Sequence, residues 1–177
     1  MDGIPTIKLY GADGCHKTNY YKILLDITEL PYQFLDVEEN KDHAEELRSL
    51  YENRKLNFPT ITIGKKKLRN PYKEDLEKWL NKLIPSRLNI IHDKKHSRFT
   101  LDINGEIAKV DYQLRHDKMY LLHSEVPYNL RGQGVGKVLV DKTFEQLTHE
   151  GYKAVAVCSY IIAVASRSEK WNEIIEY

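Results

Sequence analysis

The sequence has few cysteines and no long apolar run. Two cysteines, Cys15 and Cys158, occur among 177 residues, too few for a secreted scaffold held by disulfides, and we expect both to be free thiols in a reducing compartment. No segment approaches the ~18 consecutive apolar residues of a membrane span, and the first residues lack the basic and apolar regions of a signal peptide. These absences predict a cytoplasmic protein without a membrane partner.

Net charge is also nearly absent. The chain has 27 basic and 26 acidic residues. Residues 1–84 contain 14 of each, and the remainder contains 13 basic and 12 acidic residues. Because a nucleic-acid-binding module usually carries a basic excess, we expect no nucleic-acid partner. The basic run at 65–67 follows a glycine, and we interpret it as a solvated turn.

The first half of the chain alternates between short apolar runs and amphipathic segments. The pattern predicts strands at 6–10, 32–37 and 60–64 and helices at about 16–28, 41–53 and 74–83. This order specifies an α/β layer arrangement. Pro85 and Ser86 then predict a linker, so we expect an α/β two-domain chain with domains at 1–84 and 87–177.

The second half has an antiparallel pattern. Segments 98–103 and 106–115 flank Asn104-Gly105, a dipeptide that strongly predicts a two-residue hairpin turn. A third strand is expected at 118–126, followed by a glycine-rich loop and an amphipathic helix at 135–150. A strand at 153–161 and a short helix complete the pattern. We predict an α+β domain with a mixed, largely antiparallel sheet.

Cys15 lies between the first predicted strand and the first predicted helix, in the segment GADGCHKT. A helix N-terminus offers partial positive charge and free N–H groups, which favour the thiolate form of a cysteine. Lys17 adds a positive charge, and the Thr18 hydroxyl can hydrogen-bond a thiolate without forming a disulfide. Pro59, after Phe58, enters a strand where a proline can cap a thiol site. The pattern predicts a single reactive thiol.

The first half resembles a glutaredoxin of the thioredoxin superfamily in three segments: IKLYGADGCHKT, PYQFLDVEEN and FPTITIGKKKL. The resemblance implies a thioredoxin-like α/β sandwich, a nucleophilic Cys15, a cis Pro59 facing it, and glutathione or a protein thiol bound near Lys17 and Phe58. Thr18 replaces the family's second cysteine, and KKLRNP replaces its usual glycine pair. The chemistry left is monothiol exchange with glutathione as the resolving thiol. The alternatives are a degenerate partner-binding domain and, less favoured, a homodimer sharing an iron–sulfur cluster.

The segment RGQGVG, residues 131–136, lies between a predicted strand and a predicted helix. Its alternating glycines allow backbone N–H groups to form a concave surface, and such a surface at a helix N-terminus binds phosphate. The spacing matches neither the P-loop nor the dinucleotide-binding fingerprint. We therefore predict a phosphate-binding loop of another type.

This loop resembles the acetyl-CoA loop of the GNAT acetyltransferase superfamily, with the pattern R/Q-x-x-G-x-G/A at Arg131, Gly134 and Gly136. HSEVP before it and CSY after it resemble the small members of that superfamily. The resemblance implies a GNAT fold, an amine acceptor that is a small molecule or a peptide, and no metal. It also implies pantetheine paired with the strand end at Val126 and pyrophosphate held by the N–H groups of residues 132–137, namely Gly132, Gln133, Gly134, Val135, Gly136 and Lys137.

Acetyl transfer to an amine needs a base for the ammonium proton and an acid for the CoA thiolate. His123 or Glu125 is a candidate base. Cys158 and Tyr160 alternate along the predicted strand 153–161 and should face one side, as candidate acids, with Cys158 also a candidate nucleophile. Each of these residues could instead have a purely structural role. The family's histidine-proline-glutamate sequence near the end is replaced by RSEKW at 167–171.

Three interpretations of the whole chain follow, and in the last of them both domains act on one thiol chemistry, with Cys15 reversibly bonded to glutathione or CoA. The first is an acetyl-CoA-dependent N-acetyltransferase with an N-terminal monothiol glutaredoxin-like domain. The alternative is a non-catalytic CoA-binding sensor or adaptor, whose first domain recruits a thiol-containing partner.

Overall fold

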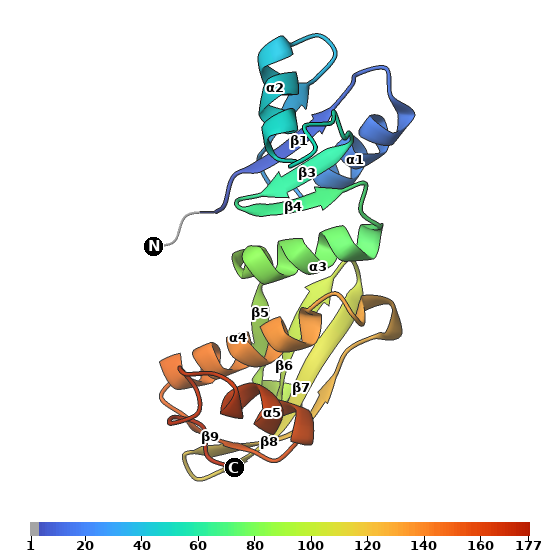
Figure 1. Ribbon diagram of the computed structural model, residues 1–177. Helices are drawn as coiled ribbons and strands as arrows, with labels where there is room; N and C mark the ends of the chain where they lie inside the picture. The colour runs from blue at the N-terminus through green and yellow to red at the C-terminus, as the bar shows by residue number, and fades with distance from the viewer. Residues whose placement is uncertain (1–3) are drawn as a thin grey trace. The chain divides into compact units, whose positions relative to one another are not determined.

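The computed structural model describes residues 4–177, which form two compact units divided between Ile84 and Pro85 (Figure 1). Each unit is described by itself. Both are mixed α/β structures with a mixed sheet. Among the helices of residues 4–177, none is long and apolar enough to cross a membrane.

The first unit has a four-stranded sheet in the order β2-β1-β3-β4. β1 is parallel to β2 and antiparallel to β3, which is antiparallel to β4. Alternation along β1 sends Leu9 into a core with helices α1 and α3 and sends Tyr10 into a second core with α2, so helices cover both faces. The elements are β1 (Ile7–Gly11), α1 (His16–Ile27), β2 (Tyr32–Asp36), α2 (Lys41–Ser49), β3 (Thr60–Ile63), β4 (Lys66–Arg69) and α3 (Lys73–Leu83).

Strand β4 corrects the interpretation of the basic run as a solvated turn. The turn is confined to Gly64 and the residue after it, and Lys66 begins an edge strand in which only Leu68 is buried. The ammonium groups of two of these lysines lie over aromatic rings: Lys66 Nζ is 3.8 Å from the Trp79 ring centroid, and Lys67 Nζ is 4.0 Å from that of Tyr51. Charged side chains on an edge strand also discourage pairing with another chain.

The second unit has a five-stranded sheet in the order β5-β6-β7-β8-β9, antiparallel except for the parallel pair β8 and β9. The predicted hairpin turn is confirmed, because Asn104 and Gly105 join β6 to β7 with φ of 56° and 84°. β5 was not predicted. The elements are β5 (Ile90–Asp93), β6 (Arg98–Ile103), β7 (Glu106–Arg115), β8 (Lys118–Glu125), α4 (Val135–His149), β9 (Lys153–Ala156) and α5 (Ser159–Ser166), with single 3-10 turns at Pro85–Arg87, Lys94–His96 and Tyr128–Leu130.

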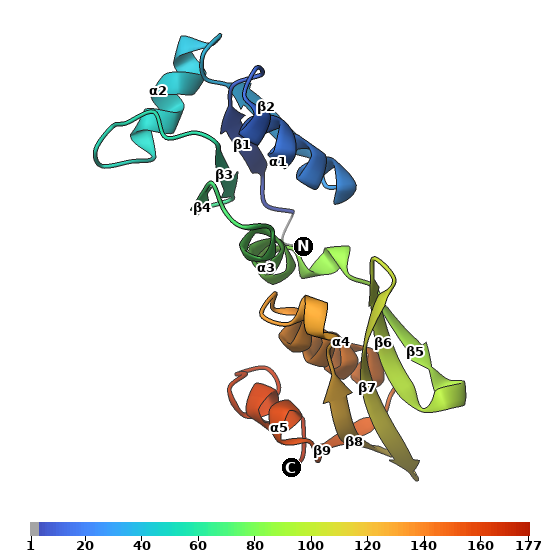
Figure 2. The ribbon, with the colours of Figure 1, turned by 90° about the vertical axis from the view of Figure 1, so that its right-hand side faces the viewer.

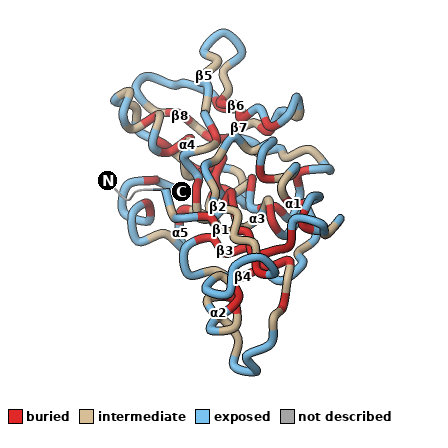
Figure 3. The backbone as a smooth tube through the Cα atoms, turned by 90° about the horizontal axis from the view of Figure 1, so that it is seen from above, coloured by how far each residue is buried: buried red, intermediate tan, exposed pale blue. Residues whose placement is uncertain are grey.

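Helices α4 and α5 lie on the same face of this sheet (Figure 2). Their buried side chains join the inward-facing strand residues in one apolar core, in which the Phe144 ring lies 5.3 Å from that of Trp171. In Figure 3 buried positions, coloured red, occur along helices and strands of the chain, whereas many loops are pale blue and exposed. The opposite sheet face carries no helix within the described part of this unit, and Ile91 and Ile107 are exposed on it.

The structure contradicts the prediction that Cys158 and Tyr160 share one strand. β9 ends at Ala156, Cys158 is the N-cap of α5, and Tyr160 lies within that helix. The ladder ends here because the N–H groups of Val157 and Cys158 both donate to the carbonyl of Leu121, at 3.0 and 3.1 Å. A short apolar run fits a buried strand and a buried helix equally well, so the sequence pattern could not place this boundary.

Candidate functional site

The end of β8 separates from β9. Pairing between the two strands covers only Lys118–Leu121 of β8, whereas pairing with β7 continues to Glu125. The register with β7 shifts between Leu121 and His123, which leaves Leu122 as the extra residue of a β-bulge. Beyond Leu121, one edge of β8 therefore has no strand partner among residues 4–177, and an amide-containing ligand can pair with such an edge.

The glycine-rich loop connects this strand end to α4. Gly132 and Gly134 have φ of 76° and 75°, a left-handed conformation that favours glycine, and Gly134 is the N-cap of α4. No described side chain caps this helix. The first N–H groups of a helix lack intrahelical acceptors. The loop and the helix start therefore provide a concave set of donors suited to phosphate.

The side chains of the loop secure its shape. Gln133 is buried, and its Nε2 donates to the carbonyl of Asn129 at 2.7 Å. Lys137 pairs with Asp141 one turn along α4. Arg131 is exposed and donates from Nε to the carbonyl of Val126 at 3.1 Å. The predicted residues 131–137 are thus contiguous with the separated end of β8.

Cys158 and Tyr160 approach this region from the first turn of α5. The Cys158 Sγ lies 3.8 Å from the Oγ of Ser124 on β8. Burial alone would raise the pKa of the Cys158 thiol, but hydrogen bonds from the N–H groups of Ile161 and Tyr160 and from Ser124 lower it below its ordinary value. Ser124 was not among the predicted site residues. Only the register of β8 with β7 shows that its side chain lies on the face of β8 that Cys158 contacts.

Tyr160 lies over the start of α4. A Cβ atom added to Gly136 would be 2.8 Å from the Tyr160 hydroxyl oxygen. Burial, with a smaller contribution from Asp141, raises the pKa of Tyr160 above its ordinary value. A tyrosine hydroxyl is protonated at neutral pH, so this one is a potential proton donor beside the glycine-rich loop.

The two candidate bases lie on the other face of β8. His123 is opposite Asp111 and Glu125 is opposite Lys109, whereas Ser124 between them is opposite the buried Val110. Lys109 Nζ lies 3.4 Å from Glu125 Oε2 and 3.2 Å from Asp111 Oδ2. The hydrogen bond to Asp111, followed by its charge, raises the pKa of Lys109. The strand end is thus flanked by candidate bases on one face and candidate acids on the other.

In the first unit, Cys15 is the N-cap of α1. The N–H of Thr18 is the main cause that lowers the pKa of the Cys15 thiol; partial burial opposes it, and the Thr18 hydroxyl and Lys17 add to it. Thr18 is fully buried, and its Oγ1 accepts from the N–H of Ala12 at 3.2 Å. A Cβ added to Gly11 would lie 2.4 Å from that oxygen, so Thr18 also anchors the helix against β1.

The Phe58-Pro59 peptide bond is cis, as the resemblance implied. Pro59 is buried, and its carbonyl accepts from the N–H of Asn70 at 3.0 Å. Phe58 is partly buried against the core beneath α2, so it contributes to packing. Lys17 is exposed on α1.

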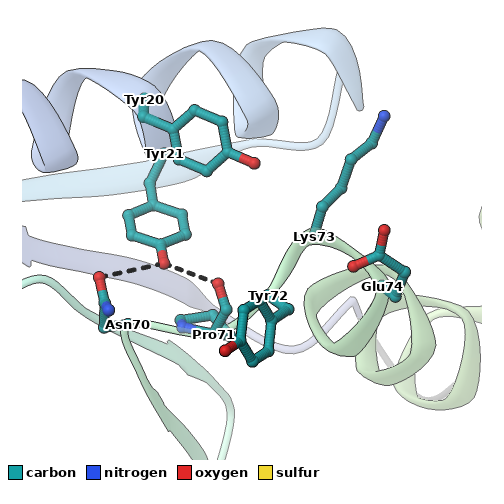
Figure 4. A pocket seen from close by; sticks show the side chains of 7 residues that line it. All are labelled: Tyr20, Tyr21, Asn70, Pro71, Tyr72, Lys73 and Glu74. Carbon is teal, nitrogen blue, oxygen red and sulfur yellow. Dashed lines mark hydrogen bonds between the residues drawn. The ribbon is translucent and has the colours of Figure 1, made fainter.

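A cavity of about 480 Å³ lies between α1 and the start of α3 (Figure 4). Tyr21 is buried and its hydroxyl donates to the carbonyl of Pro71 at 2.7 Å, whereas Tyr20 and Tyr72 are exposed. None of these residues was predicted as part of a site. The lining residues are Tyr20, Tyr21, Asn70, Pro71, Tyr72, Lys73 and Glu74. Residues 4–177 contain no cluster of histidine, cysteine or acidic side chains that could hold a metal.

Comparison with known proteins bears on the second unit. Residues 98–174 match the family model described as GCN5-related N-acetyl-transferase. Protein NATD1 of Danio rerio is 32% identical over 90 residues, which cover 44% of this chain and 74% of that protein. Protein NATD1 of Xenopus tropicalis is 33% identical over 79 residues (43% and 72%), and that of Homo sapiens is 31% identical over 77 residues (42% and 68%).

Proposed function

Because the chain belongs to the GCN5-related N-acetyltransferase family, we propose that its second unit transfers the acetyl group of acetyl-CoA to an amine. Family membership implies the use of acetyl-CoA and of an amine acceptor. The observation that carries the proposal is one juxtaposition: the separated end of β8, the glycine-rich loop and the Tyr160 hydroxyl meet at the start of α4. Binding of the CoA moiety needs a donor-lined phosphate site and a free strand edge, and departure of the CoA thiolate needs a proton donor.

The chain's own groups fit the CoA moiety. The N–H groups of residues 132–137 would hold the pyrophosphate, and the free edge of β8 up to Val126 would pair with the pantetheine amides. A side chain added at Gly132 would meet no atom within 4 Å, so the loop is open at this point. When bound, acetyl-CoA supplies a thioester that activates the acetyl group.

The flanking side chains would move the protons. Glu125 or His123 would take a proton from the acceptor ammonium, directly or through water, and the freed amine would attack the acetyl carbon. Tyr160 would donate its proton to the departing thiolate, since a tyrosine hydroxyl is protonated at neutral pH. Cys158 is the second candidate, and its lowered pKa suits a nucleophile better than an acid.

The test is steady-state acetylation of a panel of small amines and lysine peptides, with acetyl-CoA binding measured by calorimetry. We expect saturable binding, turnover on at least one amine, and a loss of turnover without loss of binding in Tyr160→Phe. Stoichiometric binding without turnover on any amine would favour the sensor or adaptor function instead. Absence of binding would overturn both.

For the first unit, we propose monothiol exchange at Cys15. The supporting observations are the helix N-cap position of Cys15 and the lowered pKa of its thiol. The Cys15 thiolate would attack a glutathione mixed disulfide, forming a Cys15–glutathione disulfide and releasing the substrate thiol. A second glutathione would then regenerate Cys15 and leave as glutathione disulfide.

A deglutathionylation assay tests this activity, with Cys15→Ser as the inactive control. Activity that persists in Cys15→Ser, or none in the wild type, would leave only a partner-binding role for this unit. The cytoplasmic location, the homodimer and the lack of a nucleic-acid partner stay predictions.

A further inference from the structure

Arg131 ties the glycine-rich loop to the end of β8. Its Nε–H donates to the carbonyl of Val126 at 3.1 Å, which closes a loop of six residues. The backbone within that loop is fixed by two turns, with Leu130 N donating to Pro127 O at 3.0 Å and Arg131 N to Tyr128 O at 3.2 Å. The side chain therefore bridges a short segment through one exposed hydrogen bond and reaches Val126, the first residue after β8.

The terminal N–H groups of the Arg131 guanidinium take no part in the bond to Val126. A guanidinium has five N–H donors, and the bond to Val126 uses the one on Nε. Its central carbon lies 5.8 Å from the centroid of the Tyr128 ring, a contact that restricts its orientation without using a donor. Arg131 is exposed and directly precedes Gly132, the first left-handed residue of the loop.

We infer that Arg131 is a positioning residue that couples the phosphate end of the cofactor site to its pantetheine end. This inference rests on the proposed function of the second unit. A phosphate in the loop would engage the terminal N–H groups of Arg131 while Nε keeps its bond to Val126. The side chain and the end of β8 would then already be ordered when a pantetheine amide pairs with that edge.

The physical basis of the coupling is the entropy of ordering. An unrestrained arginine side chain has substantial rotamer freedom, and the first ligand to fix it lowers what the second ligand must order. Coupling of this kind is reciprocal, so either ligand should strengthen the binding of the other by the same factor. The carbonyl of Val126 has a second lone pair, so the bond from Arg131 does not block an incoming amide.

The test separates CoA into two fragments, ADP for the loop and S-acetylpantetheine for the strand edge, and measures the Kd of each by calorimetry with and without the other. We expect about a fivefold lower Kd for S-acetylpantetheine when ADP is saturating, at the lower end of usual coupling factors. Arg131→Gln should reduce this factor to one while both fragments still bind. Arg131→Lys should retain ADP binding yet lose the coupling, because an ammonium lacks the planar fork.

Arg115→Gln is the matched control, since Arg115 is an exposed arginine at the β7–β8 hairpin of the same unit and should leave the coupling factor unchanged. Thermal unfolding of each variant checks that the fold is retained. Three results would overturn this inference but leave the proposed function intact. They are independent binding of the two fragments to the wild type, mutual exclusion of the two fragments, and full coupling in Arg131→Gln. Failure of ADP and acetyl-CoA to bind the wild type would overturn the proposed function with it.

Discussion

The Tyr160 hydroxyl lies so close to Gly136 that a methyl group on this glycine would be 2.8 Å from the phenolic oxygen. Gly136 is in the first turn of α4, and Tyr160 is in the first turn of α5. The absence of a side chain at Gly136 therefore lets a protonated hydroxyl reach the loop. This relationship gives a direct test of the role of Tyr160.

Gly136→Ala should lower kcat about 100-fold, because a displacement of about 1 Å in a reacting group can have that effect. The free energy of unfolding should stay the same or rise by up to ~1 kcal/mol, since alanine favours a helix more than glycine and the phenol can move. Activity assays and urea unfolding separate the two effects. Tyr160→Phe should lower kcat similarly, and the double variant should lose little more, because both changes affect one hydroxyl. Fully additive losses would contradict this explanation.

Gly134→Ala should weaken acetyl-CoA binding and destabilise the second unit. A non-glycine residue in the left-handed region costs about 1–2 kcal/mol, and relaxation of that strain would reshape the loop. Calorimetric Kd values and unfolding curves provide the measurements. Gly151→Ala is the matched control, because Gly151 also has a positive φ, 83°, and open space around it, but lies at the other end of α4. We expect similar destabilisation in both variants and weaker binding only in Gly134→Ala.

Local chemistry predicted those parts of the fold that depend on a few neighbouring residues. Asn104-Gly105 marks a hairpin because both residues adopt a positive φ, and Gly134 precedes α4 because a left-handed N-cap favours glycine. The N-cap position of Cys15 follows from its place between an apolar strand and an amphipathic helix. In each case the determining residues are adjacent in the chain.

Features set by tertiary packing could not be predicted in this way. The boundary between β9 and α5 depends on Leu121, whose carbonyl accepts two N–H groups. The contact of Ser124 with Cys158 depends on the bulge at Leu122, and the positions of the Lys66 and Lys67 side chains on β4 depend on Trp79 and Tyr51. All of these partners are distant in sequence. The sequence therefore predicted which residues belong to the candidate site. It could not predict that the candidate bases and the candidate acids lie on opposite faces of β8.

The thiol of Cys15 should titrate below the ordinary range of a free cysteine. Its pKa is lowered mainly by the N–H of Thr18 and further by the Thr18 hydroxyl. Thr18→Val keeps the backbone N–H but removes the hydroxyl, so the pKa should rise part of the way toward the free value of about 8.5. The rate of iodoacetamide labelling of the Cys15 peptide against pH, measured by mass spectrometry in a Cys158→Ser background, gives this pKa. An ordinary cysteine pKa in the parent protein would remove the basis for thiol chemistry at this site.

The second unit also contains a partly buried ion-pair network that holds the end of α4 to the sheet. The His92 Nδ1 lies 2.8 Å from Glu150 Oε2, and its Nε2 lies 2.8 Å from the Tyr112 hydroxyl. Lys94 Nζ lies 2.9 Å from the same Glu150 oxygen, and Gln146 donates to the other oxygen at 2.7 Å. Burial alone would raise the pKa of Glu150, but these partners lower it to about 2.

This network should make the stability of the second unit depend on acidic pH. Because the folded pKa of Glu150 is below its unfolded value of about 4.3, the ionised carboxylate stabilises the fold above pH 4.3, and that contribution disappears as the pH falls toward 2. Glu150→Gln should therefore lower the free energy of unfolding by on the order of 2 kcal/mol at pH 7, with a smaller difference at pH 3. Fluorescence of Trp171 in a Trp79→Phe background reports this unit alone, because Trp171 packs in its core. If the difference in the free energy of unfolding is the same at pH 7 and pH 3, Glu150 acts by packing rather than by its charge. The control is His96→Gln, at an exposed histidine in the same 3-10 turn as Lys94, which should change the free energy of unfolding little at either pH.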